Sequence, residues 1–373
     1  MQKHKKMKYY LIYYILIITI LFSCVNKYKN DRNNTSINQT HEINKYPQEK
    51  YLKNIKQLTN GGDNAEAYFS FDNSKLVFQS NHIEWGVECD QIFITEINNS
   101  NMTEEMPDKI STGLGRTTCA YFMPGDTTII YASTHLKDAQ CPHVPEKTDG
   151  KYVWPIYDSY DIFISDLKGN ILKQLTKENG YDAEATVSKQ GDKIVFTSDR
   201  SGDLELYIMD INGENIVQIT NQLGYDGGAF FSPSGDKLVF RSSRPKTEEE
   251  IKEYKELLSQ GLVKPTNMEI YVCNTDGSDL KQITSLGNAN WAPFFHPSGE
   301  KIIFSSNHQS KRGFPFNLFM IDIDGKNLEQ ITFDTMFDSF PMFSYDGKKL
   351  VFSSNRNNGG TRSTNLFIAD WIE

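Results

Sequence analysis

Histidine or arginine recurs at one position of a motif that is repeated six times, at the end of a short apolar run. These residues are His82, His135, Arg200, Arg244, His308 and Arg356. A second, mostly acidic set precedes the paired apolar runs. It comprises Asp63, Glu66, Arg116, Asp182, Glu184, Asp226, Asn290 and Asp338. Imidazole and guanidinium groups beside carboxylates could bind an anionic or sugar-like ligand, and three histidines could bind a metal ion.

The same pattern has a structural interpretation, in which a basic side chain of one repeat pairs with an acid of the next and locks the repeats together. A rule obeyed in all six repeats favours this interpretation. The histidines belong to the first, second and fifth repeats, which separates them. We therefore predict no metal site, no cofactor and no catalytic residue, and both sets remain candidate ligand-binding residues.

The repeated motif is a β-hairpin. Each copy has an aromatic or apolar run, a turn rich in Pro, Asp, Ser and Gly, and a β-branched run, which is typical of two antiparallel strands. The copies are 67–82, 120–135, 185–200, 229–244 ("AFFSPSGDKLVFRSSR"), 293–308 ("PFFHPSGEKIIFSSNH") and 341–356. A third run follows each hairpin, and a fourth ends in a short refrain such as "VQIT" (217–220). Each unit therefore predicts four antiparallel strands, A to D.

The two ends of the chain complete each other. The last copy stops after strand C at "LFIADWIE", while an unmatched refrain, "IKQLT" (55–59), precedes the first strand A. If the N-terminal strand completes the C-terminal unit, the sheets close into a ring without an open edge. The sequence predicts an all-β, six-bladed β-propeller over residues 51–373, with one inserted helix.

Two long insertions lie on the same predicted face of the ring. Because strand direction alternates, the D–A and B–C loops share one face, here called the loop face. The insertions 136–159 and 245–266 are both B–C loops. The second contains an N-cap pattern, Thr247 followed by Glu250, and an apolar helical stripe, so we predict a helix over 247–259 that packs on the ring. We expect the ligand to bind between this helix and the loop 136–159, which contributes Trp154.

The N-terminus resembles a lipoprotein signal peptide. A basic segment and an apolar segment end in "LFSC", so residues 1–23 are predicted to be removed and Cys24 to be lipidated. Residues 24–50 are polar and Asn-rich, which predicts a disordered tether. The protein is thus expected on a bacterial membrane, most simply the outer membrane, with the side left open. Its net charge of −9 argues against nucleic acid binding.

Export would permit disulfide bonds. Cys89 and Cys141 are both expected on the loop face of adjacent blades, so they are the predicted pair. Cys119, at the start of a strand A, is the competing partner. Cys273 falls within a strand C and is predicted to be a buried thiol.

The repeats resemble those of the TolB-type propeller, a relative of the WD-repeat and dipeptidyl-peptidase propellers. The resemblance rests on "FSPSGDKLVF", "FHPSGEKIIF" and "SSNR", and it covers residues 55–373. It implies the six-bladed fold. For function it implies either a periplasmic binding partner or a propeller of the kind attached to hydrolases.

Two functions are compatible with these observations. The first is a lipid-anchored, monomeric binding or scaffolding module of the envelope, which takes a protein or glycan ligand on the loop face. The second is a propeller enzyme, a lyase or hydrolase, that uses His, Arg and acidic groups of this face, with or without a divalent metal. No Gly-x-Ser-x-Gly, His-Glu-x-x-His or phosphate-binding motif is present, which favours the first.

Overall fold

The computed structural model describes residues 45–98, 105–144, 152–311 and 313–373. The predicted signal peptide (1–23), the predicted lipidation residue Cys24 and residues 25–44 of the predicted tether lie outside the described residues. In the part of the chain that is described, no helix has the length and hydropathy needed to cross a membrane.

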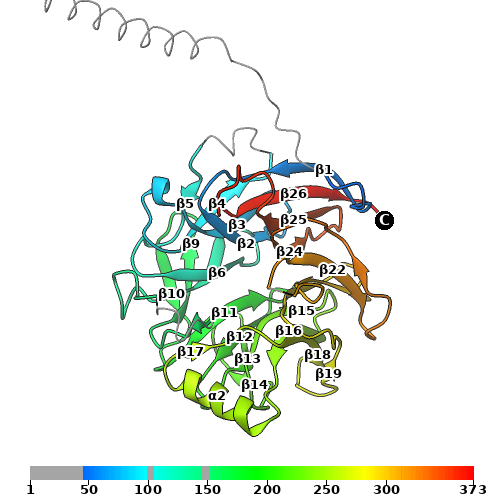
Figure 1. Cartoon of the computed structure of the whole chain (residues 1–373). Coiled ribbons are helices and arrows are strands. Elements are labelled where there is room, and N and C mark those ends of the chain that lie inside the picture. Colours follow the sequence, from blue (N-terminus) through cyan, green and yellow to red (C-terminus); the bar gives the residue numbers. More distant parts are fainter. Residues whose placement is uncertain (1–44, 99–104, 145–151, 312) are drawn as a thin grey trace, which may run out of the picture. The chain divides into compact units, whose positions relative to one another are not determined.

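The described strands form six four-stranded antiparallel sheets and one two-stranded sheet. Figure 1 shows the six larger sheets arranged around a common centre, which confirms the predicted all-β six-bladed propeller. Their innermost strands contact one another in ring order, β2–β6–β11–β15–β20–β24, and β24 contacts β2. The ring is therefore closed.

The blades are numbered in chain order and their strands are given from the inside outwards. Blade 1 comprises β2 (Asp63–Phe69), β3 (Lys75–Asn81), β4 (Gln91–Glu96) and β5 (Asp108–Lys109). Blade 2 comprises β6 (Thr117–Phe122), β7 (Thr128–Ser133), β9 (Asp161–Asp166) and β10 (Ile171–Gln174). Blade 3 comprises β11 (Asp182–Val187), β12 (Lys193–Ser198), β13 (Glu205–Asp210) and β14 (Val217–Gln218).

Blade 4 comprises β15 (Asp226–Phe231), β16 (Lys237–Ser243), β18 (Met268–Asn274) and β19 (Lys281–Gln282). Blade 5 comprises β20 (Asn290–Phe295), β21 (Lys301–Ser306), β22 (Asn317–Asp322) and β23 (Glu329–Gln330). Blade 6 comprises β24 (Asp338–Phe343), β25 (Lys349–Ser354), β26 (Asn365–Trp371) and, from the start of the folded unit, β1 (Leu52–Gln57).

The first strand completes the last blade. Strand β1 pairs antiparallel with β26, from Leu52 opposite Trp371 to Gln57 opposite Phe367. Tyr51 also stacks on the Trp371 ring, with 5.1 Å between centroids. Hydrogen bonds and apolar contacts thus join the two ends of the propeller.

The refrain after each strand D has a common structural role. Its final hydroxyl accepts a hydrogen bond from a backbone N–H of strand C, for example Thr220 from Leu206 and Thr332 from Leu318, each at 2.9 Å. Thr59, in the N-terminal refrain, accepts the equivalent bond from Leu366. These side chains extend the pairing of D strands that are often only two residues long, as in β14 and β19.

Aromatic pairs between strands B and C form the centre of each blade. Phe78 lies opposite Phe93, Phe304 opposite Phe319, and the other four blades have an aromatic pair at the same register. The strand B members of these pairs are completely buried. Cross-strand aromatic pairs stabilise antiparallel sheets, and here they also fill the space between neighbouring blades.

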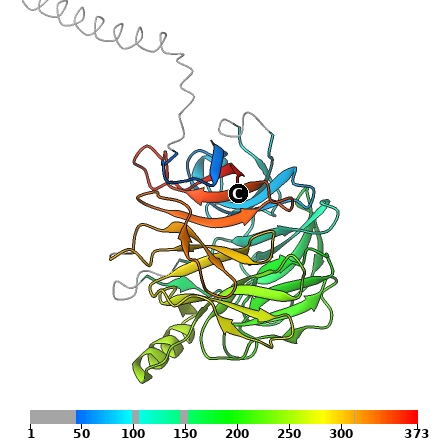
Figure 2. The ribbon, with the colours of Figure 1, turned by 90° about the vertical axis from the view of Figure 1, so that its right-hand side faces the viewer.

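The two insertions pair with each other on the loop face. Strand β8 (Trp154–Pro155) of the first pairs with β17 (Leu262–Val263) of the second. Between β16 and β17 lies the predicted helix, α2 (Glu248–Leu258), with a capping box formed by Thr247 and Glu250. Figure 2 shows α2 at the edge of the propeller. Tyr254 and Leu257 are its buried residues, so the predicted apolar stripe does pack on the ring.

The folded unit begins earlier than the boundary predicted at residue 50. The Glu49 carboxylate is completely buried and pairs with Arg356 at 2.9 Å. The Tyr46 hydroxyl donates a hydrogen bond to Asp334 at 2.9 Å. Because these polar groups are matched inside blade 6, the last residues of the predicted tether are part of the propeller.

A smaller structural element, the 3₁₀ helix η1 (Ile83–Trp85), follows β3 on the same face. The predicted disulfide partners Cys89 and Cys141 are joined in the structure, with their Cα atoms 5.9 Å apart. This bond links the B–C loop of blade 1 to the first insertion of blade 2. Cys119 and Cys273 are free thiols.

Candidate ligand-binding cavity

A ring of six residues surrounds the propeller axis on the loop face. Each innermost strand has a register shift near its start, and one residue of each shift has a positive φ of between 47° and 60°. This bulge ring consists of Glu66, Cys119, Glu184, Gly228, Ala292 and Phe340. All six line one cavity. Bulges of this kind redirect side chains, and here they present one residue per blade to the centre.

The cavity has a volume of about 1220 Å³ and is closed below by aromatic rings. Tyr68 of blade 1 contacts Phe230 of blade 4, with 5.6 Å between centroids, and Phe230 contacts Phe294 of blade 5 at 5.0 Å. Blades 1 and 4 are opposite each other in a six-bladed ring. Contact between their side chains therefore means that aromatic rings cross the channel at this level.

The two sides of the cavity differ in chemistry. The bulge ring is polar in blades 1 to 3 and is apolar or lacks a side chain in blades 4 to 6. A chain of aromatic contacts covers the apolar side, with centroids 5.2 Å apart for Trp154–Trp291, 4.4 Å for Trp291–Phe316 and 5.7 Å for Phe316–Phe337. Trp154 comes from the first insertion, so the β8–β17 sheet contributes to the wall.

The Glu184 carboxylate is held in place in the cavity by an ion pair and by hydrogen bonds. Arg241 forms an ion pair with it, and the Tyr225 hydroxyl and the Gly228 N–H donate hydrogen bonds to it, each at 2.9 Å. Burial opposes ionisation of Glu184, but the Arg241 charge and these hydrogen bonds outweigh it and lower the pKa below the usual value. Arg241 also lies over the ring of Trp154, 5.4 Å from the centroid.

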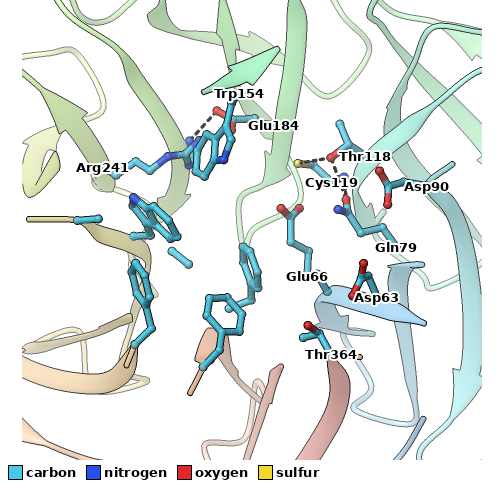
Figure 3. A pocket seen from close by; sticks show the side chains of 18 of the residues that line it. Asp63, Glu66, Gln79, Asp90, Thr118, Cys119, Trp154, Glu184, Arg241 and Thr364 are labelled. Carbon is cyan, nitrogen blue, oxygen red and sulfur yellow. Dashed lines mark hydrogen bonds and ion pairs between the residues drawn. The ribbon is translucent and has the colours of Figure 1, made fainter. Parts of the chain in front are cut away.

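Glu66 is different, because its Oε2 atom is buried and has no hydrogen-bond partner among the described residues. Burial raises the pKa of Glu66 to about 7, and the negative charge of Glu184 acts in the same direction. Figure 3 shows the Glu66 side chain extending from blade 1 into the cavity, on the side where Cys119, Thr118 and Gln79 lie. Gln79 Oε1 accepts hydrogen bonds from the Thr118 hydroxyl at 2.8 Å and from the Cys119 N–H at 3.2 Å.

Comparisons with known proteins agree with this architecture. Residues 153–255 match the model of the PD40 family, described as the TolB beta propeller domain. This part of the six-bladed propeller is therefore similar to the TolB propeller repeats. Putative TolB from Agrobacterium tumefaciens is 18% identical with a TM-score of 0.55, over 84% of this chain and 91% of that chain. TolB from Acinetobacter baumannii is 18% identical with a TM-score of 0.51, over 84% of this chain and 64% of that chain.

More distant similarity extends to enzymes. An oligogalacturonate lyase from Vibrio parahaemolyticus is 12% identical, with a TM-score of 0.47, over 86% of this chain and 94% of that chain. No curated protein sequence matches this chain. At such identities the likeness shows the fold alone. The function of this propeller must therefore be inferred from its cavity.

The propeller brings five of the predicted site residues to the cavity. They are Asp63, Glu66, Arg116, Trp154 and Glu184. Arg116 forms an ion pair with Asp90, which also lines the cavity. The other candidates are not among the lining residues, and their contacts explain why.

Three predicted arginines are paired within their own blades. Arg200 contacts Asp182 at 2.8 Å, Arg244 contacts Asp226 at 2.5 Å, and Arg356 contacts Asp338 at 3.0 Å. Each aspartate lies opposite the serine that comes two residues before the arginine, so both side chains are on one face of the hairpin. The predicted lock between neighbouring repeats is therefore wrong for these residues, because the pair joins strands A and B of one blade.

The three histidines occupy the corresponding position in blades 1, 2 and 5 and do not converge. His82 stacks on Trp85 with 4.3 Å between centroids, while His135 and His308 contact Phe163 and Phe319 of their own blades. The strand A residue opposite is neutral in these blades, and is Asn64, Thr117 or Asn290. Within the described residues, no three His, Cys, Asp or Glu side chains are grouped so that they could hold a metal ion.

Several cavity residues were not predicted, including Arg241, Cys119, Gln79, Trp291 and Phe340. A signal for the bulge ring was present in the repeats, because its members directly precede the six aligned copies. The residue types at this position range from Glu to Gly and Phe, so the position recurs but no pattern of residue type identifies it. Arg241 lies within strand β16. The alternation of side chains along this strand does not indicate that Arg241 reaches Glu184.

Proposed function

We propose that this chain is a binding module of the bacterial envelope, which holds a protein segment or a glycan in the cavity of the loop face without catalysing a reaction. The observation that carries the proposal is the cavity itself, about 1220 Å³ in volume and floored by aromatic rings. Binding sites commonly combine extended aromatic walls with a few fixed polar groups.

The polar groups of the cavity are held in place by the fold. Arg241 is tied to Glu184 and Tyr225, and Arg116 is tied to Asp90. A ligand therefore meets groups whose positions are already set, which reduces the entropy lost on binding. The insertions further support recognition here, because the β8–β17 sheet places Trp154 at the wall.

The envelope part of the proposal rests on the sequence. The basic and apolar N-terminal segments end in "LFSC", which supports export and lipidation at Cys24. Attachment by acyl chains would keep the propeller at a membrane while its cavity remained free to bind.

A second candidate function is an acid–base enzyme, and Glu66 is the observation that favours it. A carboxylic acid with a pKa of about 7 inside a cavity could give or accept a proton near neutral pH. Turnover of a glycan substrate that is lost in Glu66→Gln would support this candidate over the binding module.

Capture from an envelope extract tests the binding function. Trp154→Ala combined with Phe340→Ala removes two aromatic rings from the cavity wall, and we expect about a tenfold or greater loss of captured ligand. Asp324→Ala changes an exposed turn on the opposite face and is the matched control. Melting temperatures of both variants establish that they fold. Capture that survives the double variant but is lost with the control would reverse the assignment of the binding face.

A further inference from the structure

The charges that line the cavity do not balance. The described lining residues include four acids, Asp63, Glu66, Asp90 and Glu184, and three arginines, Arg116, Arg241 and Arg362, with no lysine or histidine. Asp90 and Glu184 each have an arginine partner. Arg362 is exposed and has no ion pair with either remaining acid among the described residues. Four acids against three arginines leave one excess negative charge, and the two described acids without an arginine partner are Asp63 and Glu66, both from β2.

One oxygen of the Glu66 carboxylate lacks a partner among the described residues, although a side-chain hydrogen bond with Cys119 also acts on this carboxyl group. A buried carboxylate is stable when a donor or a cation contacts it, yet Oε2 has neither among the described residues. The titratable and charged groups that act on it are Tyr68 of its own strand, Cys119 of β6, Glu184 of β11, Arg241 of β16 and Asp90 before β4. Arg241, the only cation among them, is already bound to Glu184.

Aromatic rings line the same cavity as this acid. Phe340 belongs to blade 6, the neighbour of blade 1 in the ring, and it contacts Phe337 at 6.4 Å between centroids. Trp291 and Phe316 continue the aromatic wall. Aromatic faces attract cations, and the attraction strengthens where water is excluded. A cavity that combines an unpartnered carboxylate oxygen with an aromatic wall is complementary to an organic cation, and it would repel an anion.

We infer that the ligand presents an organic cation, an ammonium or guanidinium group on an apolar or sugar frame, to the Glu66 carboxylate. The inference rests on the proposed binding function and names the chemistry of its ligand. The cation would supply the contact that Oε2 lacks, and Asp63 would add to the attraction from the same strand. The group could belong to a basic protein side chain or to an amino sugar.

Acetylation of the probe tests the inference, because it removes the positive charge and keeps most of the frame. The probes are a trilysine peptide and its Nε-acetylated form, and in a second arm a glucosamine tetramer and its N-acetylated form. Binding is followed by calorimetry at pH 7. If the cation of the ligand belongs to a protein, we expect the acetylated peptide to bind at least about tenfold more weakly than trilysine. If it belongs to an amino sugar, we expect the same difference between the two sugar probes.

Variants locate the effect at Glu66. Glu66→Gln keeps the shape and removes the charge, so it should weaken binding of the cationic probe about tenfold and leave the acetylated probe nearly unchanged. Asp324→Asn removes an equal charge from the opposite face and should change neither. The affinity of the wild type for the cation should rise with pH through about 7, as Glu66 ionises, and this rise should be absent in Glu66→Gln.

The outcomes separate this inference from the proposed function. Equal affinity for the charged and acetylated probes, tighter binding at acid pH, or no binding of any probe would each overturn the cation assignment. Capture from the envelope extract that still depends on Trp154 and Phe340 would leave the binding function standing. If Glu66→Gln failed to fold, the acetylation comparison and the pH series on the wild-type protein would decide.

Discussion

At the residue scale, the repeated position at the end of strand B stabilises the fold, and the repeated bulge position of strand A lines the cavity. Arginine at the end of strand B always faces an aspartate of strand A, whereas histidine there faces Asn or Thr. The match follows from charge, because a buried aspartate needs a cation and a neutral side chain does not. The bulge ring follows no such rule, and its variety gives the cavity one polar and one apolar side.

Glu66 should make the propeller less stable at neutral and alkaline pH. Burial raises its folded-state pKa to about 7, well above the ordinary value, so the folded protein holds this proton more tightly than the unfolded chain. The stabilisation is complete below the unfolded pKa and is lost as pH rises to the folded pKa. A shift of this size corresponds to about 3 kcal/mol.

Urea unfolding at pH 5 and pH 8 measures this effect. Glu66→Gln carries no titrating group at this position, so it should equal or approach the wild type at pH 5 and exceed it by about 2 to 3 kcal/mol at pH 8. A constant difference between the two proteins at both pH values would show that Glu66 titrates normally.

At the element scale, the stability of the ring depends on a strand from the other end of the folded unit. Strand β1 covers the edge of β26, and Glu49 places a second acid on Arg356 beside Asp338. The N-terminal segment thus contributes backbone hydrogen bonds, apolar contacts and a buried ion pair to blade 6. The other five blades obtain their outermost strand from the sequence that directly follows strand C.

Two truncated chains should show whether β1 and Glu49, rather than residues 1–44, contribute to the stability of the propeller. A chain that begins at residue 58 lacks β1 and Glu49, so it should aggregate or melt at least about 10 °C lower, because β26 becomes an open edge. A chain that begins at residue 45 keeps both and should melt like the full-length protein. Calorimetry of the two proteins provides the measurement, and similar melting temperatures for both would contradict closure by β1.

At the scale of the whole molecule, the cavity faces in the same direction as both insertions. The β8–β17 sheet and the disulfide between Cys89 and Cys141 connect loops of different blades on that face. Tight turns are described on the opposite face, such as the one at Asp324 and Gly325. The proposed ligand-binding cavity and the proposed lipidation residue Cys24 thus belong to separate parts of the sequence.

Attachment itself can be tested at Cys24. If "LFSC" directs lipidation, Cys24→Ala should move the protein from the membrane fraction to the soluble fraction, because the acyl chains are lost. Immunoblots of fractionated cells measure this change, and Cys273→Ala is a control in the propeller. Membrane association that persists in Cys24→Ala would exclude the lipid anchor.

Much of the fold could be predicted from the sequence because its determinants are local and repeated. Hairpin turns, alternating strands, the refrain and the cap at Thr247 all act over a few residues, and six copies make each signal stronger. The unmatched strand at 55–59 then required closure of the ring. Placing loops on faces also favoured Cys89 and Cys141 as a disulfide pair, with Cys119 as the competing partner, and the structure joins Cys89 to Cys141.

Which residues line the cavity depends on the tertiary structure. Asp182 and Glu184 are two residues apart, yet the bulge places Glu184 in the cavity while Asp182 pairs with Arg200. Arg241 reaches Glu184 of the neighbouring blade, whereas Arg244, three residues later, remains in its own blade. These differences arise from bulge geometry and from contacts between distant segments of a closed ring. No pattern of neighbouring residues encodes such contacts, because they exist only when the blades are assembled.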